Sequence, residues 1–149
     1  MNFLARVDLD FVSYEGSDHP AVLLRLLQVC RDHGFKVHFF ITSRTLRAFP
    51  AAAEAILNEG HHLDWWKVSG QTKADELFAR HGIKPEFSLL DEEITQFDGN
   101  LVGAEIAHAV TLHDLTQNDP RLRDWTARVQ AAVSSGRKMV TLRDLARDV

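Results

Sequence analysis

The sequence predicts an α/β domain built around a mostly parallel sheet. Segments with the apolar pattern of strands alternate with segments whose apolar residues have helical spacing. Strands joined through helices form right-handed βα units, and such units produce parallel pairing. No linker, internal repeat or low-complexity segment interrupts the 149 residues, so we expect a single domain over residues 1–149. An open doubly wound sheet and an incomplete barrel both fit this alternation.

Six segments are expected to be strands. The first, FLARVDLDF, has an apolar residue at every second position from Phe3 to Phe11, which is the period of a strand. The others are short and rich in apolar residues. The expected strands cover residues 3–11, 35–42, 61–66, 86–90, 106–114 and 138–142. Residues 91–100 show no clear period.

Five further segments are expected to be helices. The clearest is HPAVLLRLLQVCRDHG, which begins near Pro20 and ends near Gly34. Its apolar face consists of Val22, Leu23, Leu26, Leu27 and Cys30. The other helices cover residues 45–60, with a boundary or kink at Pro50, and residues 73–82, 119–136 and 142–149. We expect the core to include Leu23, Leu27, Phe39, Ile41 and Val129.

The composition argues against several classes of protein. The net charge is −4 and no run of lysine and arginine stands out, so neither nucleic acid nor an anionic membrane is an expected partner. The single cysteine, Cys30, allows no intramolecular disulfide and no cysteine-based zinc site. The first residues do not have the pattern of a signal peptide, and no apolar run approaches the ~20 residues of a membrane span. We therefore expect a cytoplasmic protein.

Polar residues stand at the carboxyl ends of the expected strands, where parallel α/β sheets bind their ligands. Asp8 and Asp10 are two residues apart, so on a regular strand they point the same way. Two neighbouring carboxylates need a cation, a proton or different roles, and one can bind a metal while the other acts as a base. His113 ends another expected strand and is suited to general acid or base chemistry.

The stretch EGHHLDWW contains further candidate binding residues. Trp65 and Trp66 can form a platform for a sugar only if their rings are exposed, and otherwise they pack in the interior. His61 and His62 are adjacent, so on a strand they point to opposite faces and cannot both bind one ion. We count His61, Trp65 and Trp66 as candidate binding residues for a carbohydrate or another small molecule.

The stretch HGFKVHFFITSRTLRAFPAAAEAILNEGHHL resembles the middle of the polysaccharide deacetylase family, which is the NodB-homology domain or carbohydrate esterase family 4. That family has a G-x-K-A-T-F-F-V strand, a helix containing a proline, and a G-H-E-[LI] strand start. The matching residues are Gly34, Lys36, Phe39, Phe40, Pro50, Gly60, His61 and Leu63. VDLDF resembles the aspartate motif of the family, TLHD its L-x-H-D stretch, and SGRKMVTLRDL its closing segment. The resemblance therefore covers nearly the whole chain.

The resemblance implies an irregular (β/α) barrel and a metal-dependent removal of acetyl groups from sugars. It implies that Asp8 is the catalytic base, Asp10 the metal-ligand carboxylate and His113 the general acid. The metal would polarise the acetyl carbonyl and activate a water molecule. His61 matches a histidine of the family that is not a metal ligand.

The sequence departs from the family at the metal site. The family continues to an H-[ST]-x-x-H motif, and its two histidines are replaced here by Trp66 and Gly70. The R-x-P motif is not visible, and Ser88 stands where its arginine is expected. Asp10 alone would hold an ion poorly, because catalytic zinc usually has three protein ligands. We therefore expect a divergent, shortened deacetylase-like domain with an incomplete barrel and a degenerate metal motif, with no cofactor or at most zinc.

Three alternatives stay open at this point. The first is an active metal-dependent deacetylase with a rebuilt site, and another is a non-catalytic interaction module with exposed tryptophans. The third is a phosphatase, because VDLDFV and FFITSR also resemble the haloacid dehalogenase superfamily. In that reading Asp8 would be the nucleophile and Asp10 the acid/base. Thr42 or Ser43 would bind the phosphate, and Lys67 or Lys84 would supply the cation. Asp91 would be the magnesium ligand.

Overall fold

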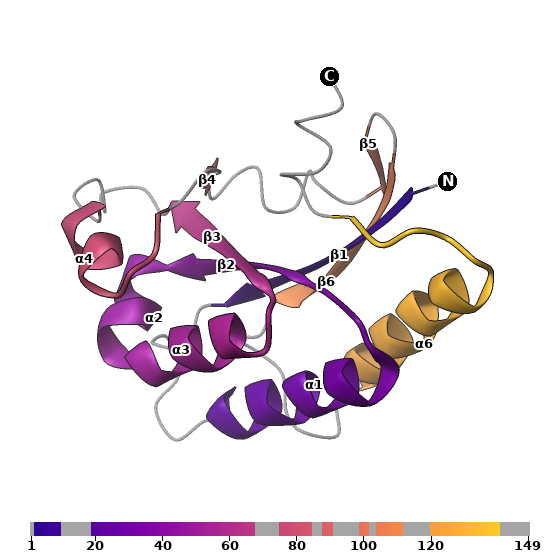
Figure 1. Cartoon of the computed structure of the whole chain (residues 1–149), viewed down its shortest axis with the longest axis horizontal. Helices are drawn as coiled ribbons and strands as arrows, with labels where there is room; N and C mark the ends of the chain where they lie inside the picture. Colours follow the sequence, from indigo (N-terminus) through magenta and orange to yellow (C-terminus); the bar gives the residue numbers. More distant parts are fainter. Residues whose placement is uncertain are drawn as a thin grey trace.

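A computed structural model describes residues 2–9, 19–67, 75–84, 88–90, 99–101, 104–111 and 120–140. Within these ranges one six-stranded sheet has the order β4-β3-β2-β1-β6-β5 (Figure 1). The elements are β1 (Asn2–Leu9), α1 (His19–His33), β2 (His38–Thr42), α2 (Ser43–Ala48), α3 (Pro50–Asn58), β3 (His62–Lys67), α4 (Asp75–Arg80), β4 (Ser88–Leu90), β5 (Gly99–Leu101), β6 (Ala104–Thr111) and α6 (Pro120–Ser134).

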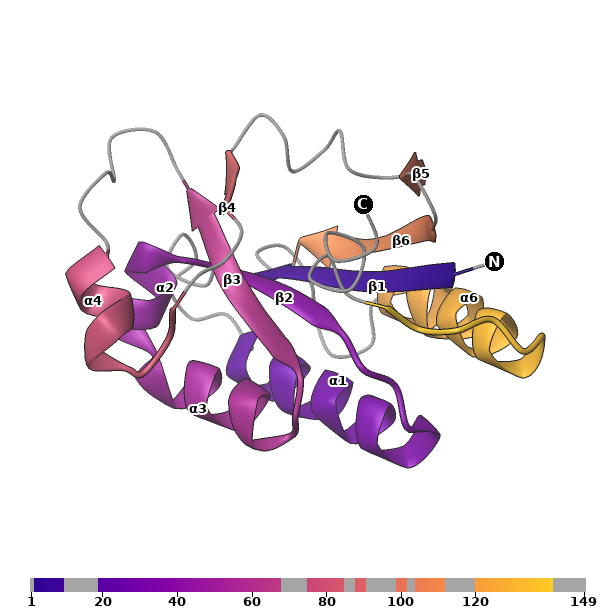
Figure 2. The ribbon, with the colours of Figure 1, turned by 45° about the horizontal axis from the view of Figure 1, so that its top comes forward.

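The pairing of the strands confirms a mostly parallel α/β sheet. β1 pairs in parallel with both β2 and β6, and β3 pairs in parallel with β2 and β4. Only β5 is antiparallel among the described strands, and it lies against β6 at one edge. Helices α1, α3 and α6 lie on the same side of the sheet (Figure 2). A doubly wound sheet has helices on both faces, so the placement of these three helices on one side agrees better with the expected incomplete barrel.

The central strands are buried on both faces. On β1, Phe3, Ala5, Val7 and Leu9 belong to the core cluster shared with the helices. Side chains alternate along a strand, so the residues between them point to the opposite face. These are Leu4, Arg6 and Asp8, and all three are buried as well. The burial of this strand on both faces indicates that the sheet is covered on both sides.

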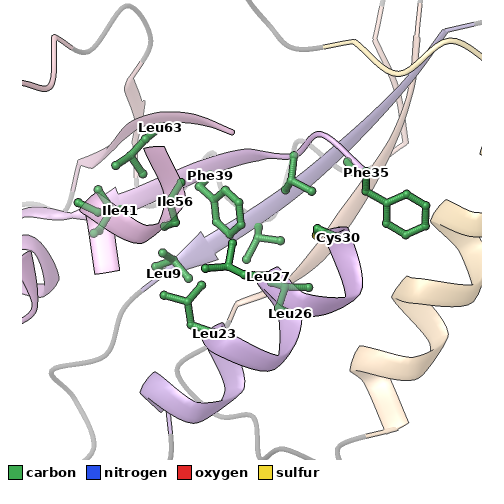
Figure 3. Packing of buried hydrophobic residues seen from close by; sticks show 14 of the residues in the cluster. Leu9, Leu23, Leu26, Leu27, Cys30, Phe35, Phe39, Ile41, Ile56 and Leu63 are labelled. Carbon is green, nitrogen blue, oxygen red and sulfur yellow. The ribbon is translucent and has the colours of Figure 1, made fainter. Parts of the chain in front are cut away.

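The main core lies between the sheet and the helices. Leu23, Leu26, Leu27 and Cys30 of α1 point toward Phe39 and its neighbours on the strands (Figure 3). The five expected core residues, Leu23, Leu27, Phe39, Ile41 and Val129, are all buried, at 3% exposure or less. The helical face predicted from the sequence is therefore confirmed for these residues. Val22 lies in α1, but its side chain is outside the described part.

The expected helix over residues 45–60 is two helices in the structure. Pro50 begins α3, and Phe49 before it has φ −135° and ψ 65°, outside the helical region. A residue that precedes proline avoids the helical region for steric reasons, and proline itself is well suited to a first helical turn. The Phe49 N–H still donates to the Thr45 carbonyl at 2.8 Å, which closes α2. The boundary that the sequence suggested at Pro50 is confirmed.

Two strand predictions need correction, at β5 and at residues 138–142. β5 was missed, because three residues that pair with an antiparallel neighbour carry no periodic signal of their own. Of the strand expected over residues 138–142, the structure describes residues 138–140, which form one bridge in which Met139 pairs with Phe3. The Phe3 N–H donates to the Lys138 carbonyl at 2.8 Å, and the Val140 N–H donates to the Phe3 carbonyl at 2.9 Å. Residues 141–149, where the last helix was expected, lie outside the described residues.

Within the described ranges, no helix combines the length and the apolar character that crossing a membrane requires.

Replacing Leu27 with alanine tests the assignment of the buried face of α1. We expect Leu27→Ala to lower the free energy of unfolding by about 2–5 kcal/mol, because it removes a large side chain from a packed core. Leu24→Ala is the matched control in the same helix, since Leu24 is 63% exposed and Leu27 only 3%. The control should change stability by no more than about 0.5 kcal/mol. Equal losses for the two variants in urea unfolding would contradict the assignment.

Candidate functional site

The face of the sheet turned away from α1, α3 and α6 carries charged and aromatic side chains. The register places Arg6 of β1 opposite His38 of β2, which in turn lies opposite His62 of β3. One row further along, Asp8 lies opposite Phe40, and Phe40 lies opposite Asp64. We call the set Arg6, Asp8, His38, Phe40, Thr42, His62, Asp64 and Trp66 the polar face.

Asp8 forms an ion pair with Arg6 on β1. Its Oδ2 accepts a hydrogen bond from Arg6 Nη2 at 3.0 Å, and the two side chains are 0% and 1% exposed. Two residues that are two positions apart on a strand share a face, and this brings the guanidinium to the carboxylate. Removing one partner of such a buried pair leaves the other charge uncompensated, which is strongly destabilising.

His38 and Asp64 form a second buried polar pair on β2 and β3. His38 Nε2 lies 2.6 Å from Asp64 Oδ2, and both side chains are fully buried. The imidazole also stacks on Phe40, with ring centroids 4.6 Å apart, and it lies 5.9 Å from the ring of His62. A hydrogen bond to a carboxylate orients an imidazole firmly, because it is stronger than a neutral one.

Trp65 and Trp66 lie on opposite faces of β3. Trp65 points toward the helices, where its ring centroid lies 5.6 Å from that of Phe78. Trp66 lies on the polar face, and the two side chains are only 6% and 5% exposed. Neither ring therefore presents an open face for a sugar in this structure, and packing is the role that the burial supports.

His61 lies just before β3 and points toward the helices. Its Nδ1 accepts a hydrogen bond from the Val37 N–H at 3.2 Å, and its ring makes an edge contact with Phe39. Burial lowers the pKa of His61 to about 4, so the ring is neutral near pH 7 and can accept this bond. His61 and His62 point to opposite faces of the sheet, as their adjacency predicts.

Asp10, the candidate metal ligand, and His113, the candidate general acid, lie outside the described residues. Gly70 and Asp91 lie outside them as well. The expected meeting of Asp10 and His113 with Asp8 stays a prediction. Asp8 and Trp66 do share the polar face, near the carboxyl ends of β1 and β3.

The phosphatase alternative gains no support from the described residues. Thr42 caps α2, because its Oγ1 accepts from the Thr45 N–H at 3.3 Å, and it also bonds the Thr45 hydroxyl at 2.7 Å. The Lys67 ammonium lies over the Trp65 ring, 5.1 Å from its centroid, on the face opposite Asp8. Thr42 and Lys67 are thus occupied with interactions away from the Asp8 carboxylate.

The described part of the polar face does not provide a metal site. No group of three or more histidine, cysteine, aspartate or glutamate side chains there could hold an ion. Trp66 stands where the resemblance places a metal-ligand histidine, and an indole is only a hydrogen-bond donor. Cys30 adds no ligand, because burial raises the pKa of its thiol to about 12 and it belongs to the core.

Sequence reasoning missed Arg6 and His38 as parts of this site, whereas Asp64 belongs to a stretch that the sequence had singled out. A signal was present, because Arg6 and His38 are polar residues within the otherwise apolar strand segments RVDLDF and FKVHFF. The spacing of Arg6 and Asp8 placed them on one face. The pairing of His38 with Asp64 depends on the register of β2 and β3, which the sequence does not show.

Comparison with solved structures identifies the fold. The peptidoglycan deacetylase PdaC from Bacillus subtilis superposes with a TM-score of 0.69 at 10% identity, over 98% of this chain and 90% of that one. The Bc1960 peptidoglycan N-acetylglucosamine deacetylase gives a TM-score of 0.57 at 16% identity, over 95% of this chain and 86% of that one. This chain has the polysaccharide deacetylase fold.

A third deacetylase structure agrees with the first two. The T48 deacetylase, solved with substrate, gives a TM-score of 0.64 at 13% identity, over 99% of this chain and 92% of that one. The sequence itself matches no protein-family model and no curated protein. The resemblance drawn from the sequence is therefore confirmed at the level of the fold.

The low pKa of His61 predicts how stability depends on pH. Between about pH 6.5 and about pH 4 the unfolded chain takes up a proton at His61, whereas the folded chain does not. The stability that His61 contributes is thus fully present above pH 6.5 and is lost as the pH falls toward 4. In His61→Gln the side-chain oxygen can still accept from Val37, and nothing titrates at this position.

The measurement is urea unfolding between pH 4 and pH 7.5. The free energy of unfolding of the wild type should fall more steeply with decreasing pH than that of His61→Gln. Above pH 7 the two curves should differ only by a constant. Parallel curves throughout would show that His61 takes up its proton equally well in the folded protein.

Proposed function

We propose that this protein is a deacetylase-fold protein that binds carbohydrate and has lost metal-dependent deacetylation. The observation that carries the proposal is Trp66. Its indole is buried on the polar face at the position where the resemblance places the first metal-ligand histidine. A buried tryptophan fills space that an ion and its water would need, and it offers no lone pair to a metal.

The surroundings of Asp8, the proposed catalytic base, agree with this proposal. In a metal-dependent hydrolase of this type, Asp8 would take a proton from water activated by the ion. In this structure its carboxylate is fully buried and bonded to Arg6. A carboxylate oxygen that already accepts a hydrogen bond from a guanidinium has one lone pair fewer to offer a water molecule.

Carbohydrate binding is the part of the function for which the comparisons offer support. PdaC and Bc1960 are peptidoglycan deacetylases by name, and the T48 deacetylase was solved with its substrate. Their sites belong to the same fold as this chain. The burial of Trp65 and Trp66 means that a bound sugar would contact polar groups rather than stack on these rings.

An assay of acetate release tests the loss of activity. We expect no turnover of N-acetylglucosamine oligomers above the buffer rate, with or without added zinc, because the ligand set is incomplete. Isothermal titration calorimetry with the same oligomers should detect binding, and the fully deacetylated oligomers serve as the matched control ligand. Turnover that a chelator abolishes would overturn the proposal and show a rebuilt metal site.

Restoring the family motif tests the position assigned to Trp66. The double variant Trp66→His and Gly70→His should bind zinc more tightly than the wild type, because it returns two imidazoles to the metal motif. Zinc affinity is measured by calorimetry, and circular dichroism checks that the fold is kept. Trp65→His with Gly70→His is the control, since Trp65 points toward the helices. No gain in the first variant, with the fold intact, would mean that the motif is misaligned.

A further inference from the structure

The first residues of β3 are joined to Val37, the residue before β2, by two hydrogen bonds. The Val37 N–H donates to His61 Nδ1 at 3.2 Å, and the Val37 carbonyl accepts from the His62 N–H at 3.2 Å. Val37 and His61 are both buried, so the bond between the amide and the imidazole is shielded from water. One of the two bonds that join these strands where they begin thus depends on a titratable side chain.

The turn before His61 determines where the imidazole lies. Gly60 has φ 80°, in the left-handed region that favours glycine, and the His61 N–H donates to the Ile56 carbonyl at 3.2 Å. Lys36 Nζ donates to the Glu59 carbonyl at 3.0 Å, and a Cβ at residue 60 would lie only 3.3 Å from that nitrogen. The turn therefore brings the imidazole close to the Lys36 ammonium.

The bond to Val37 exists only while His61 Nδ1 keeps its lone pair. Proton uptake at Nδ1 changes the acceptor into a donor, and two N–H groups would then face each other without an acceptor between them. Burying such groups without a partner is costly. Burial is also the main reason that the pKa of His61 falls to about 4. Opening of this contact to water removes both obstacles to protonation.

Charged and titratable groups on several elements act on this imidazole. Lys36, ahead of β2, and His62, on β3, lower its pKa, whereas the Glu59 carboxylate at the end of α3 raises it. Glu59 is in turn paired with Arg31 of α1. The Cys30 thiol of α1 carries no charge near pH 7, because burial raises its pKa to about 12. The proton must therefore enter beside an ammonium group, and the Glu59 carboxylate offsets part of that repulsion.

We propose that His61 is an acid-sensitive contact between β2 and β3, whose opening takes up a proton and frees the first residues of β3 without unfolding the domain. The inference goes beyond the effect of His61 on overall stability, because it places the event at one junction of the sheet. It is independent of the proposed carbohydrate binding. β3 also carries Asp64 and Trp66, so the contact holds one end of the strand that supplies them to the polar face.

Hydrogen exchange of the Val37 amide, followed by NMR, tests the proposal. Between about pH 6.5 and about pH 4 the open contact binds a proton at His61, whereas the closed contact does not. The protection factor of Val37 should therefore fall by up to about 300-fold as the pH is lowered through this range. Low concentrations of urea should leave its exchange unchanged, because a local opening exposes little surface. The Val7 amide of the central strand β1 should instead exchange faster in urea.

Three variants assign the effect to the imidazole and to the charges around it. His61→Gln keeps an oxygen that can accept from Val37 and has no group that titrates, so its Val37 protection should not fall in this range. Lys36→Met raises the pKa of His61 in the closed contact, so the fall should be smaller than in the wild type. Glu59→Gln lowers that pKa, so the fall should be larger.

Three results would each overturn the inference. They are an equal fall of Val37 protection in the wild type and in His61→Gln, shifts of Lys36→Met and Glu59→Gln in the same direction, and a response of the Val37 amide to urea equal to that of Val7. If His61→Gln does not fold, the opposite shifts in the two charge variants still decide. No sugar or metal enters these measurements, so the assay of acetate release tests the proposed function separately.

Discussion

The burial of β1 on both faces is the constraint on which the rest of the structure depends. Every second residue of this strand packs against the helices, and the residues between them include an arginine and an aspartate that cannot reach water. The apolar positions are stabilised by the hydrophobic effect, so α1, α3 and α6 cover one face. The charged positions can be tolerated only where they compensate one another, and this requirement determines the chemistry of the opposite face.

The polar face satisfies that requirement with protein side chains in two adjacent rows of the sheet. Arg6 and His38 lie in one row, and the carboxylates they serve lie in the next. In the described part of this polysaccharide deacetylase fold, both buried carboxylates are thus bonded to protein side chains.

The segment around β3 illustrates how one short sequence serves two faces. His61 and Trp65 point toward the helices, and Asp64 and Trp66 point to the polar face. His61 accepts a backbone hydrogen bond in a dry environment, which keeps its ring neutral. Residues that look like one cluster of metal and sugar ligands in the sequence are separated by the sheet itself.

The sequence by itself determined the parallel α/β class, the buried face of α1, the boundary at Pro50 and the resemblance to deacetylases. These depend on local periodicity, on the steric demands of proline and on motifs read along the chain, all of which are properties of neighbouring residues. Only the tertiary structure decided that His38 meets Asp64, 26 positions away, and that β5 pairs with β6. It also decided that Trp65 and Trp66 are both buried, because register and burial depend on which strands come together in space.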